Sequence, residues 1–157
     1  MSQSVFSLTR AGVSLFVETT SGTPNVFYWG KALTAKNTPE QLLLAITEPA
    51  PHGYYDHAHR GGVWRENARG FWGRPAILAH RDGKDWSQLF TLVDAKQTES
   101  SMTFISRDAD LGVEVSVAYQ LTEQGLVLVN HSITNLREGT LFVENSTAFL
   151  PVPDHAT

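Results

Sequence analysis

Two histidines, His57 and His59, stand two positions apart and are followed by a glutamate, Glu66. Residues i and i+2 of a strand share a face, so the two imidazoles could hold one metal ion with the Glu66 carboxylate as a third ligand. The acid, however, follows His59 by seven positions, and no later histidine stands on a clear strand to complete the set. We therefore favour solvated or hydrogen-bonded loop histidines, and keep a metal site on these three residues as the alternative.

A second cluster combines aromatic and arginine side chains, namely Trp64, Arg65, Trp72 and Arg74. Aromatic faces stack on the apolar face of a sugar ring, and guanidinium groups donate hydrogen bonds to its hydroxyls. These four residues are therefore candidate substrate-binding residues on a carbohydrate-facing surface. The same residue types also suit a second small core or a docking surface for another domain, and the sequence leaves both interpretations open.

Other candidate catalytic groups have structural explanations. The pairs Asp108/Asp110 and Asp82/Asp85 have the composition that acid–base hydrolysis requires, but each lies in an expected turn, where aspartate bonds the local backbone. His131 lies on the apolar series of its strand, so we expect a core histidine with one ring nitrogen bonded to the backbone. Neither a Gly-x-Ser-x-Gly elbow nor a glycine-rich phosphate loop occurs. We expect no catalytic residue and no cofactor in this chain.

The composition is that of a globular protein. Its 157 residues, 41% of them hydrophobic, are enough to bury one core, so a single domain over 1–157 is expected. The net charge of −4 and the scattered lysines and arginines argue against a nucleic-acid partner. We expect no membrane partner, because there is no export signal and no run of about 18 apolar residues. The absence of cysteine removes disulfides and thiolate metal sites and is compatible with the cytoplasm, where we place the protein.

Among the elements that could form the scaffold, the segment 111–121 has the clearest strand pattern in the chain. Every second residue from Leu111 to Leu121 is apolar, which is the period of a strand with one wet face. A helix over the same span would put Glu114 into its apolar stripe. Because long strands build large sheets, we predict an all-β fold, an antiparallel β-sandwich.

Most of the remaining chain also predicts strands. We expect a hairpin from 5–9 and 13–19, strands at 26–29, 76–80 and 89–93, and an antiparallel meander of 101–107, 111–121, 126–135 and 141–149. The one expected helix begins at a capping box, Thr38-Pro39-Glu40-Gln41. The stretch 49–75 has no period, and since loops of such length are usually functional, we expect any site there. The chain stops without a glycine or charged tail, so we also expect a fragment of a longer protein and a partial domain.

Four stretches follow one another in an order typical of a known family. They are Phe27-Tyr28-Trp29-Gly30-Lys31-Ala32-Leu33, Gly70-Phe71-Trp72-Gly73-Arg74-Pro75-Ala76, Asp110-Leu111-Gly112-Val113-Glu114-Val115 with a following Tyr119, and Ile133-Thr134-Asn135. They resemble, respectively, the hydrophobic-Trp-Gly-x-x-Leu, Gly-Asp-Phe-Arg-x-Pro-Ala, Asp-x-x-x-Gly-Leu-Glu-Val and Ile-x-Asn stretches of bacterial α-galactosidases (melibiases) of glycoside hydrolase family 36. The resemblance is to the N-terminal region of that family and spans nearly the whole chain.

This resemblance implies a β-supersandwich, related to galactose-mutarotase-like folds, that precedes a catalytic (β/α)8 barrel. In the family, the nucleophile and the acid/base are aspartates of the barrel, and terminal α-galactosides are hydrolysed with retention. The chain alone is therefore expected to be inactive. Its expected partners are its own barrel, further copies of itself in a homo-oligomer, and the galactoside substrate of the parent enzyme.

In tetrameric members a loop of this domain reaches a neighbouring active site, where the Asp and Arg of the Gly-Asp-Phe-Arg motif assist the galactose pocket. Here Phe71 replaces the Asp, Trp72 the Phe and Gly73 the Arg, while Arg74 is shifted by one position. Two alternatives to the family assignment stay open. One is a free-standing carbohydrate-binding β-sandwich, and the other is a cupin-like metal-binding protein that uses His57, His59 and Glu66.

Overall fold

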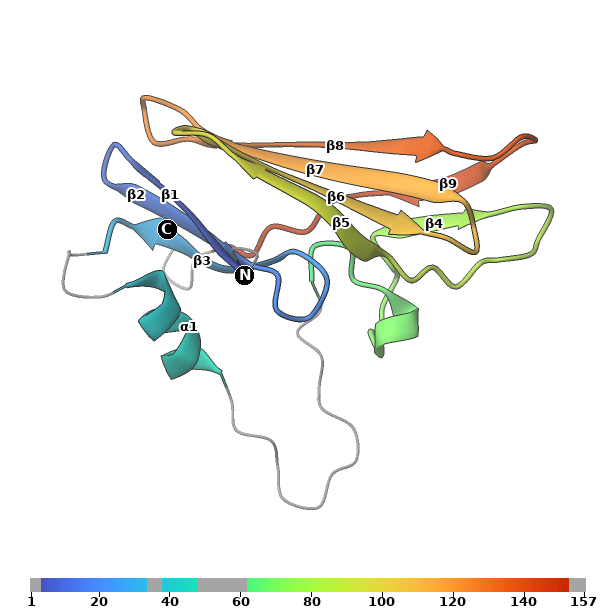
Figure 1. The fold of residues 1–157 in the computed structure, drawn as a ribbon, viewed down its shortest axis with the longest axis horizontal. Helices are drawn as coiled ribbons and strands as arrows, with labels where there is room; N and C mark the ends of the chain where they lie inside the picture. The colour runs from blue at the N-terminus through green and yellow to red at the C-terminus, as the bar shows by residue number, and fades with distance from the viewer. Residues whose placement is uncertain (1–3, 34–37, 48–61, 153–157) are drawn as a thin grey trace, which may run out of the picture.

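The computed structural model describes residues 4–33, 38–47 and 62–152. Within these ranges the chain is almost entirely β-structure with short helical pieces (Figure 1). The elements are β1 (Val5–Arg10), β2 (Val13–Glu18), β3 (Asn25–Lys31), α1 (Pro39–Ile46), the 3₁₀ helix η1 (Asn67–Arg69), β4 (Ile77–His80), β5 (Thr91–Gln97), β6 (Ser101–Asp108), β7 (Val113–Leu121), β8 (Val127–Asn135) and β9 (Phe142–Ser146).

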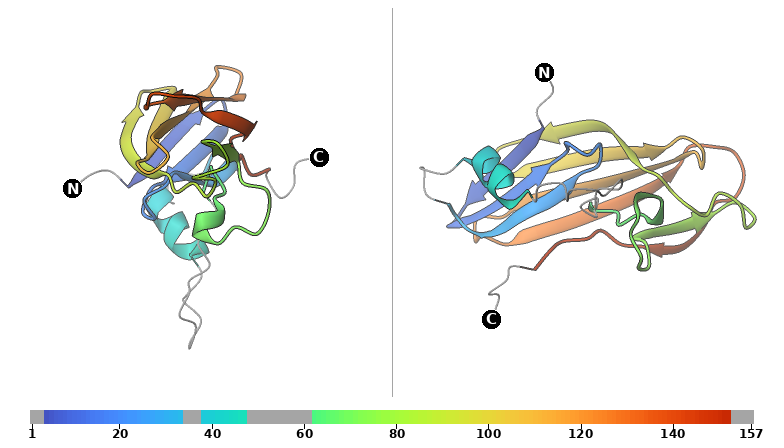
Figure 2. Two further views of the ribbon diagram at one scale, coloured as in Figure 1. Left: turned by 90° about the vertical axis from the view of Figure 1, so that its right-hand side faces the viewer. Right: turned by 90° about the horizontal axis from the view of Figure 1, so that it is seen from below.

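The strands form two main antiparallel sheets that face each other. One sheet has the order β1-β2-β3 and the other β5-β6-β7-β8, while β4 and β9 pair separately. Figure 1 shows the two main sheets as layers, with α1 on the outer side of the β1–β3 sheet, and Figure 2 shows the same arrangement from two further directions. The predicted all-β, antiparallel sandwich is confirmed.

The core lies between these layers and follows from the period of two along β6 and β7. In β7, the residues Val113, Val115, Val117, Tyr119 and Leu121 are all buried, while those between them are more exposed. The ring of Phe104 on β6 meets Phe6 of β1 edge-to-face at 5.0 Å, which joins the two sheets. Such alternation buries one face of each strand and leaves the other wet, as the sequence predicted.

The helix begins as its sequence predicts. The Thr38 hydroxyl accepts a hydrogen bond from the Gln41 backbone N–H at 3.2 Å, and the Gln41 side chain accepts one from the Thr38 N–H at 3.1 Å. This capping box, with Pro39 in the first turn, satisfies donors that a helix start otherwise leaves unpaired. No residue of α1 is buried, and no helix in the described ranges is long and apolar enough to cross a membrane.

The predicted four-strand meander is wrong in its last member. Strands β6, β7 and β8 are neighbours, but β9 leaves that sheet and pairs with β4. The side chain of Asn145 donates to the carbonyls of Pro75 and Ala76, at 3.0 and 2.9 Å, which fastens β9 to the start of β4. Strand β5 is also displaced along the chain from the predicted 89–93, because the Leu89 N–H bonds the Asp108 carboxylate instead of a neighbouring strand.

Candidate functional site

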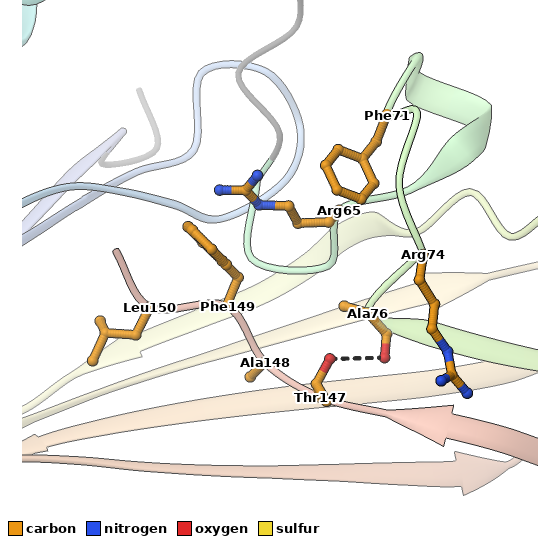
Figure 3. A pocket seen from close by; sticks show the side chains of 8 residues that line it. All are labelled: Arg65, Phe71, Arg74, Ala76, Thr147, Ala148, Phe149 and Leu150. Atoms are coloured by element: carbon orange, nitrogen blue, oxygen red, sulfur yellow. Dashed lines mark hydrogen bonds between the residues drawn. The ribbon is translucent and has the colours of Figure 1, made fainter. Parts of the chain in front are cut away.

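A pocket of about 350 Å³ opens where the segment that follows Gly62 meets the segment that follows β9. Its lining consists of Arg65, Phe71, Arg74, Ala76, Thr147, Ala148, Phe149 and Leu150 (Figure 3). Two backbone hydrogen bonds fix the walls: the Ala76 N–H donates to the Trp64 carbonyl at 2.9 Å, and the Phe149 N–H donates to the Val63 carbonyl at 3.0 Å. Residues 63–65 are thereby held between the start of β4 and the segment that follows β9.

Arg65 provides the unusual chemistry of this pocket. Its guanidinium carbon lies 3.4 Å from the centre of the Phe149 ring and 5.3 Å from that of Phe71, so the cation contacts aromatic faces. Its Nε is buried without a hydrogen-bond partner, and no carboxylate pairs with it among the described residues. Burial lowers the pKa of the Arg65 guanidinium, although an arginine stays protonated under all ordinary conditions.

Behind the pocket, Glu66 and Arg69 clamp the backbone of Phe90. The Glu66 carboxylate accepts hydrogen bonds from the Phe90 N–H and from Arg69 Nε, the latter at 2.8 Å, and the Arg69 guanidinium donates to the Phe90 carbonyl at 2.7 Å. Burial raises the pKa of Glu66, and its bonds to Phe90 and Arg69 oppose that shift. The pair therefore serves as a structural brace that fixes η1 against the strand layer.

The four residues expected to bind substrate take three different positions. Arg65 and Arg74 both line the pocket, but Figure 3 shows their side chains extending in opposite directions. Trp72, beside the lining residue Phe71, is 100% exposed, whereas Trp64 is completely buried and packs against Phe90 with ring centres 6.2 Å apart. The structure thus brings Arg65, Arg74 and the Trp72 loop to one place, and it puts Trp64 beneath them in the core. Substrate binding by these residues stays a prediction.

Of the alternative metal ligands, His57 and His59 lie outside the described residues. Glu66 is described, and its carboxylate is engaged by Phe90 and Arg69. In the part of the chain that the structure describes, no group of three or more histidine, aspartate or glutamate side chains is placed to hold a metal ion.

Asp82, Asp85 and Asp110 lie in turns, as expected, whereas Asp108 is the last residue of β6 and caps the turn that follows it. Asp108 is 6% exposed, and its two oxygens accept hydrogen bonds from the Leu111 and Leu89 N–H groups, both at 2.8 Å. Asp82 and Asp85 both have a positive φ in the exposed turn after β4. His131 departs from its prediction: it is exposed, and its Nε2 bonds the Ser146 hydroxyl at 2.8 Å in place of a backbone group. The reason is that β8 lies at the edge of its sheet among the described strands, so its inner face is only partly covered.

Sequence reasoning missed two residues that shape the site. Phe149 was expected only as the end of a strand, yet its ring faces Arg65. Asn67 belongs to no motif of the sequence, but its side-chain amide donates hydrogen bonds to the carbonyls of Phe71 and Gly73, at 2.6 and 3.0 Å. No local pattern marks either residue, because each acts through a contact that the fold creates.

Comparison with known proteins agrees with this architecture. The family model described as the glycosyl hydrolase family 36 N-terminal domain matches residues 22–157. The chain belongs to this family. An α-galactosidase of Escherichia coli is 30% identical over 131 residues, which are 83% of this chain and 18% of that protein.

Solved structures of family 36 α-galactosidases share the fold. The AgaA enzyme of Geobacillus stearothermophilus superposes with a TM-score of 0.68 at 15% identity, over 92% of this chain and 24% of that one. The α-galactosidase of Lactobacillus brevis gives a TM-score of 0.67 at 14% identity, over 92% and 23%. This family 36 N-terminal domain therefore spans about a fifth to a quarter of the length of these relatives.

Proposed function

We propose that this chain is the non-catalytic N-terminal domain of an α-galactosidase that hydrolyses terminal α-galactosides, with the reaction centre in a barrel outside these 157 residues. Membership of family 36 over residues 22–157 is the observation that carries the proposal. The E. coli relative, itself an α-galactosidase, supports the choice of substrate class. Within the described residues the buried carboxylates Glu18, Glu66 and Asp108 are each committed to hydrogen bonds, which is consistent with a supporting role.

A second part of the proposal concerns the sugar. We propose that Trp72, Arg65 and Arg74 help to shape the sugar pocket of the enzyme. An exposed indole offers an apolar face to a pyranose ring, and unpaired guanidinium groups offer donors to its hydroxyls. Trp72 has its whole surface exposed, and neither arginine makes a side-chain hydrogen bond or ion pair with another described residue.

The third part concerns packing. We propose that the domain packs on the catalytic barrel and takes part in a homo-oligomer in the cytoplasm. Large apolar side chains that stay exposed on the described surface support such contacts, among them Leu44 at 78%, Leu126 at 62% and Val152 at 71%. The complete lack of cysteine is compatible with the cytoplasmic location.

An enzyme assay tests the non-catalytic assignment and the sugar-pocket role separately. The isolated chain is expected to leave a chromogenic α-galactoside intact, while the full-length protein hydrolyses it. In the full-length protein, Trp72→Ala is expected to raise KM about 3- to 10-fold, since an aromatic contact of this kind contributes roughly 0.5–1.5 kcal/mol. Turnover by the isolated chain would overturn the non-catalytic assignment, and an unchanged KM in Trp72→Ala would overturn the part assigned to the sugar pocket.

A free-standing carbohydrate-binding domain is the second candidate, and the fully exposed Trp72 favours it. It predicts that the isolated chain itself binds galactosides, seen as a saturable change in tryptophan emission. The change would disappear in Trp72→Ala but persist in Trp86→Ala, a matched variant of another exposed tryptophan, at 64%.

A further inference from the structure

The loop that carries Trp72 is held by several hydrogen bonds, although the Trp72 side chain itself is fully exposed. Trp72 is 100% exposed, whereas its neighbour Phe71 turns inward to line the pocket (Figure 3). An indole kept wholly in water gains nothing from burial. The hydrogen bonds around Trp72 therefore do not serve to bury its side chain in the core.

A single side chain, Asn67, spans this loop. Its amide nitrogen donates to the Phe71 carbonyl at 2.6 Å and to the Gly73 carbonyl at 3.0 Å, so the carbonyls before and after Trp72 are tied to one group. The Phe71 N–H also donates to the Glu66 carbonyl at 3.2 Å, which fixes the loop to the Glu66–Arg69 brace. The backbone on both sides of Trp72 is thus anchored to η1.

The glycine at position 73 makes room for the Phe71 ring beneath the loop. A Cβ on Gly73 would lie 2.7 Å from Cζ of the Phe71 ring, which is closer than two non-bonded carbon atoms approach. Glycine lets this ring fold beneath the loop toward Arg65, where ring and guanidinium lie 5.3 Å apart. With Phe71 tucked beneath the loop, Trp72 is the only exposed aromatic side chain among residues 70–74.

We propose that Asn67 is a positioning residue for substrate, which holds Trp72 as a preorganised platform for the apolar face of a pyranoside. This inference rests on the proposed function. A platform already fixed in its bound geometry avoids the entropy cost of ordering a loop when the ligand arrives, so the clamp raises affinity without touching the ligand. Asn67 is itself exposed, and its replacement leaves the buried core unchanged.

The test is a double-mutant cycle in the full-length enzyme, with KM and kcat measured on an α-galactoside. Asn67→Ala and the isosteric Asn67→Asp, which has no amide donor, are expected to raise KM about 3- to 10-fold with kcat changed less than twofold. The pair Asn67→Ala/Trp72→Ala is expected to be no worse than Trp72→Ala alone, because the clamp acts only through the indole.

Asn135→Ala is the matched control, since Asn135 also ties a loop, donating to the Gly139 carbonyl at 2.9 Å. It is expected to leave KM unchanged even where it lowers the melting temperature as much as Asn67→Ala does. If Trp72→Ala raises KM and Asn67→Ala does not, or if their effects simply add, the positioning role is overturned while the proposed function stands. If Trp72→Ala itself leaves KM unchanged, the proposed sugar contact fails and the positioning role fails with it.

Discussion

The buried polar side chains of this domain fall into two groups. Glu18, Glu66 and Asp108 are each satisfied by two or more hydrogen bonds, and they fix turns or strand ends. Tyr119, near the C-terminal end of β7, is fully buried, and its hydroxyl has no hydrogen-bond partner among the described residues. Its burial raises the pKa of the phenol, because the ionised form would stand unsolvated in the core. An unpaired buried hydroxyl is a net cost to the fold.

The first prediction follows from that cost. Tyr119→Phe is expected to raise the free energy of unfolding by roughly 1 kcal/mol, since it removes an unsatisfied hydroxyl and keeps the ring that meets Phe104. Urea unfolding of the isolated chain measures the change. Tyr28→Phe is the control, because the Tyr28 hydroxyl donates to the Lys31 carbonyl at 2.6 Å and its removal should destabilise by about 0.5–1 kcal/mol. A loss of stability in Tyr119→Phe would mean that the hydroxyl is bound after all.

The second prediction concerns the pH dependence of Glu66. Desolvation raises its folded pKa above the unfolded value, so the folded state holds the proton more tightly. Glu66 therefore contributes to the free energy of unfolding at pH values below the ordinary glutamate pKa, and this contribution is lost as the pH rises through the raised pKa. As the pH rises from the ordinary glutamate range through the raised pKa, the free energy of unfolding of the wild type should therefore fall relative to that of Glu66→Gln. The opposite slope would show that the ion pair with Arg69 outweighs burial.

At the scale of elements, the sequence predicted what depends on neighbours along the chain. The alternation of 111–121 gave the strand β7, and the Thr38–Gln41 spacing gave the helix start, because both patterns are local. The partner of β9 was missed because strand pairing is a long-range choice, made here by Asn145 reaching the carbonyls of Pro75 and Ala76. The pocket was missed for the same reason, since Arg65 and Phe149 meet only in the folded chain.

One turn between elements gives the third prediction. Gly112, just before β7, has φ +68°, and a Cβ there would lie 2.4 Å from Cδ of Arg137. The guanidinium of Arg137 lies over this turn and donates to the Ala109 and Asp110 carbonyls, both at 2.7 Å. Gly112→Ala should therefore cost more than the roughly 1 kcal/mol expected from backbone strain alone.

The matched control for this turn is Gly83→Ala. Gly83 has φ +77° with nothing within 4 Å of the added methyl, so it reports the strain without the clash. The difference between the two variants in urea unfolding measures the packing of Arg137 on Gly112. If both variants lower the free energy of unfolding equally, Arg137 moves aside freely when the methyl group is added. The packing of Arg137 on Gly112 would then not stabilise the connection between β8 and β9.

For the whole molecule, the edges of the two sheets differ in how they are protected. The side chain of Gln97 on β5 accepts from the Ser7 N–H and donates to the Ser7 carbonyl, at 3.3 and 3.0 Å, which covers β1. Strand β5 also carries the Lys96–Asp94 ion pair. Strand β8 pairs only with β7 among the described strands, and none of its nine residues is charged. A long uncharged edge is a template for pairing with another chain or segment.

The fourth prediction is that the isolated chain self-associates through β8. Size-exclusion chromatography should give a concentration-dependent mass above the 17.3 kDa of one copy. Asn130→Lys, on the exposed outer face of this edge, should restore the single-copy mass, because edge lysines oppose strand addition. A wild-type chain that elutes as a single copy at all concentrations would contradict the prediction.

Gln120→Lys separates an edge effect from a charge effect. Gln120 is exposed and lies opposite Leu128 on the same sheet, but on β7, which is paired on both sides. Each variant adds one positive charge to a chain of net charge −4, so both weaken its overall repulsion equally. If only Asn130→Lys disperses the assembly, the free hydrogen-bonding groups of β8 are its cause. In that case, a longer enzyme of this family has to cover the β8 edge with a further strand or another segment. If both variants disperse the assembly equally, the added charge is the cause and the edge needs no such cover.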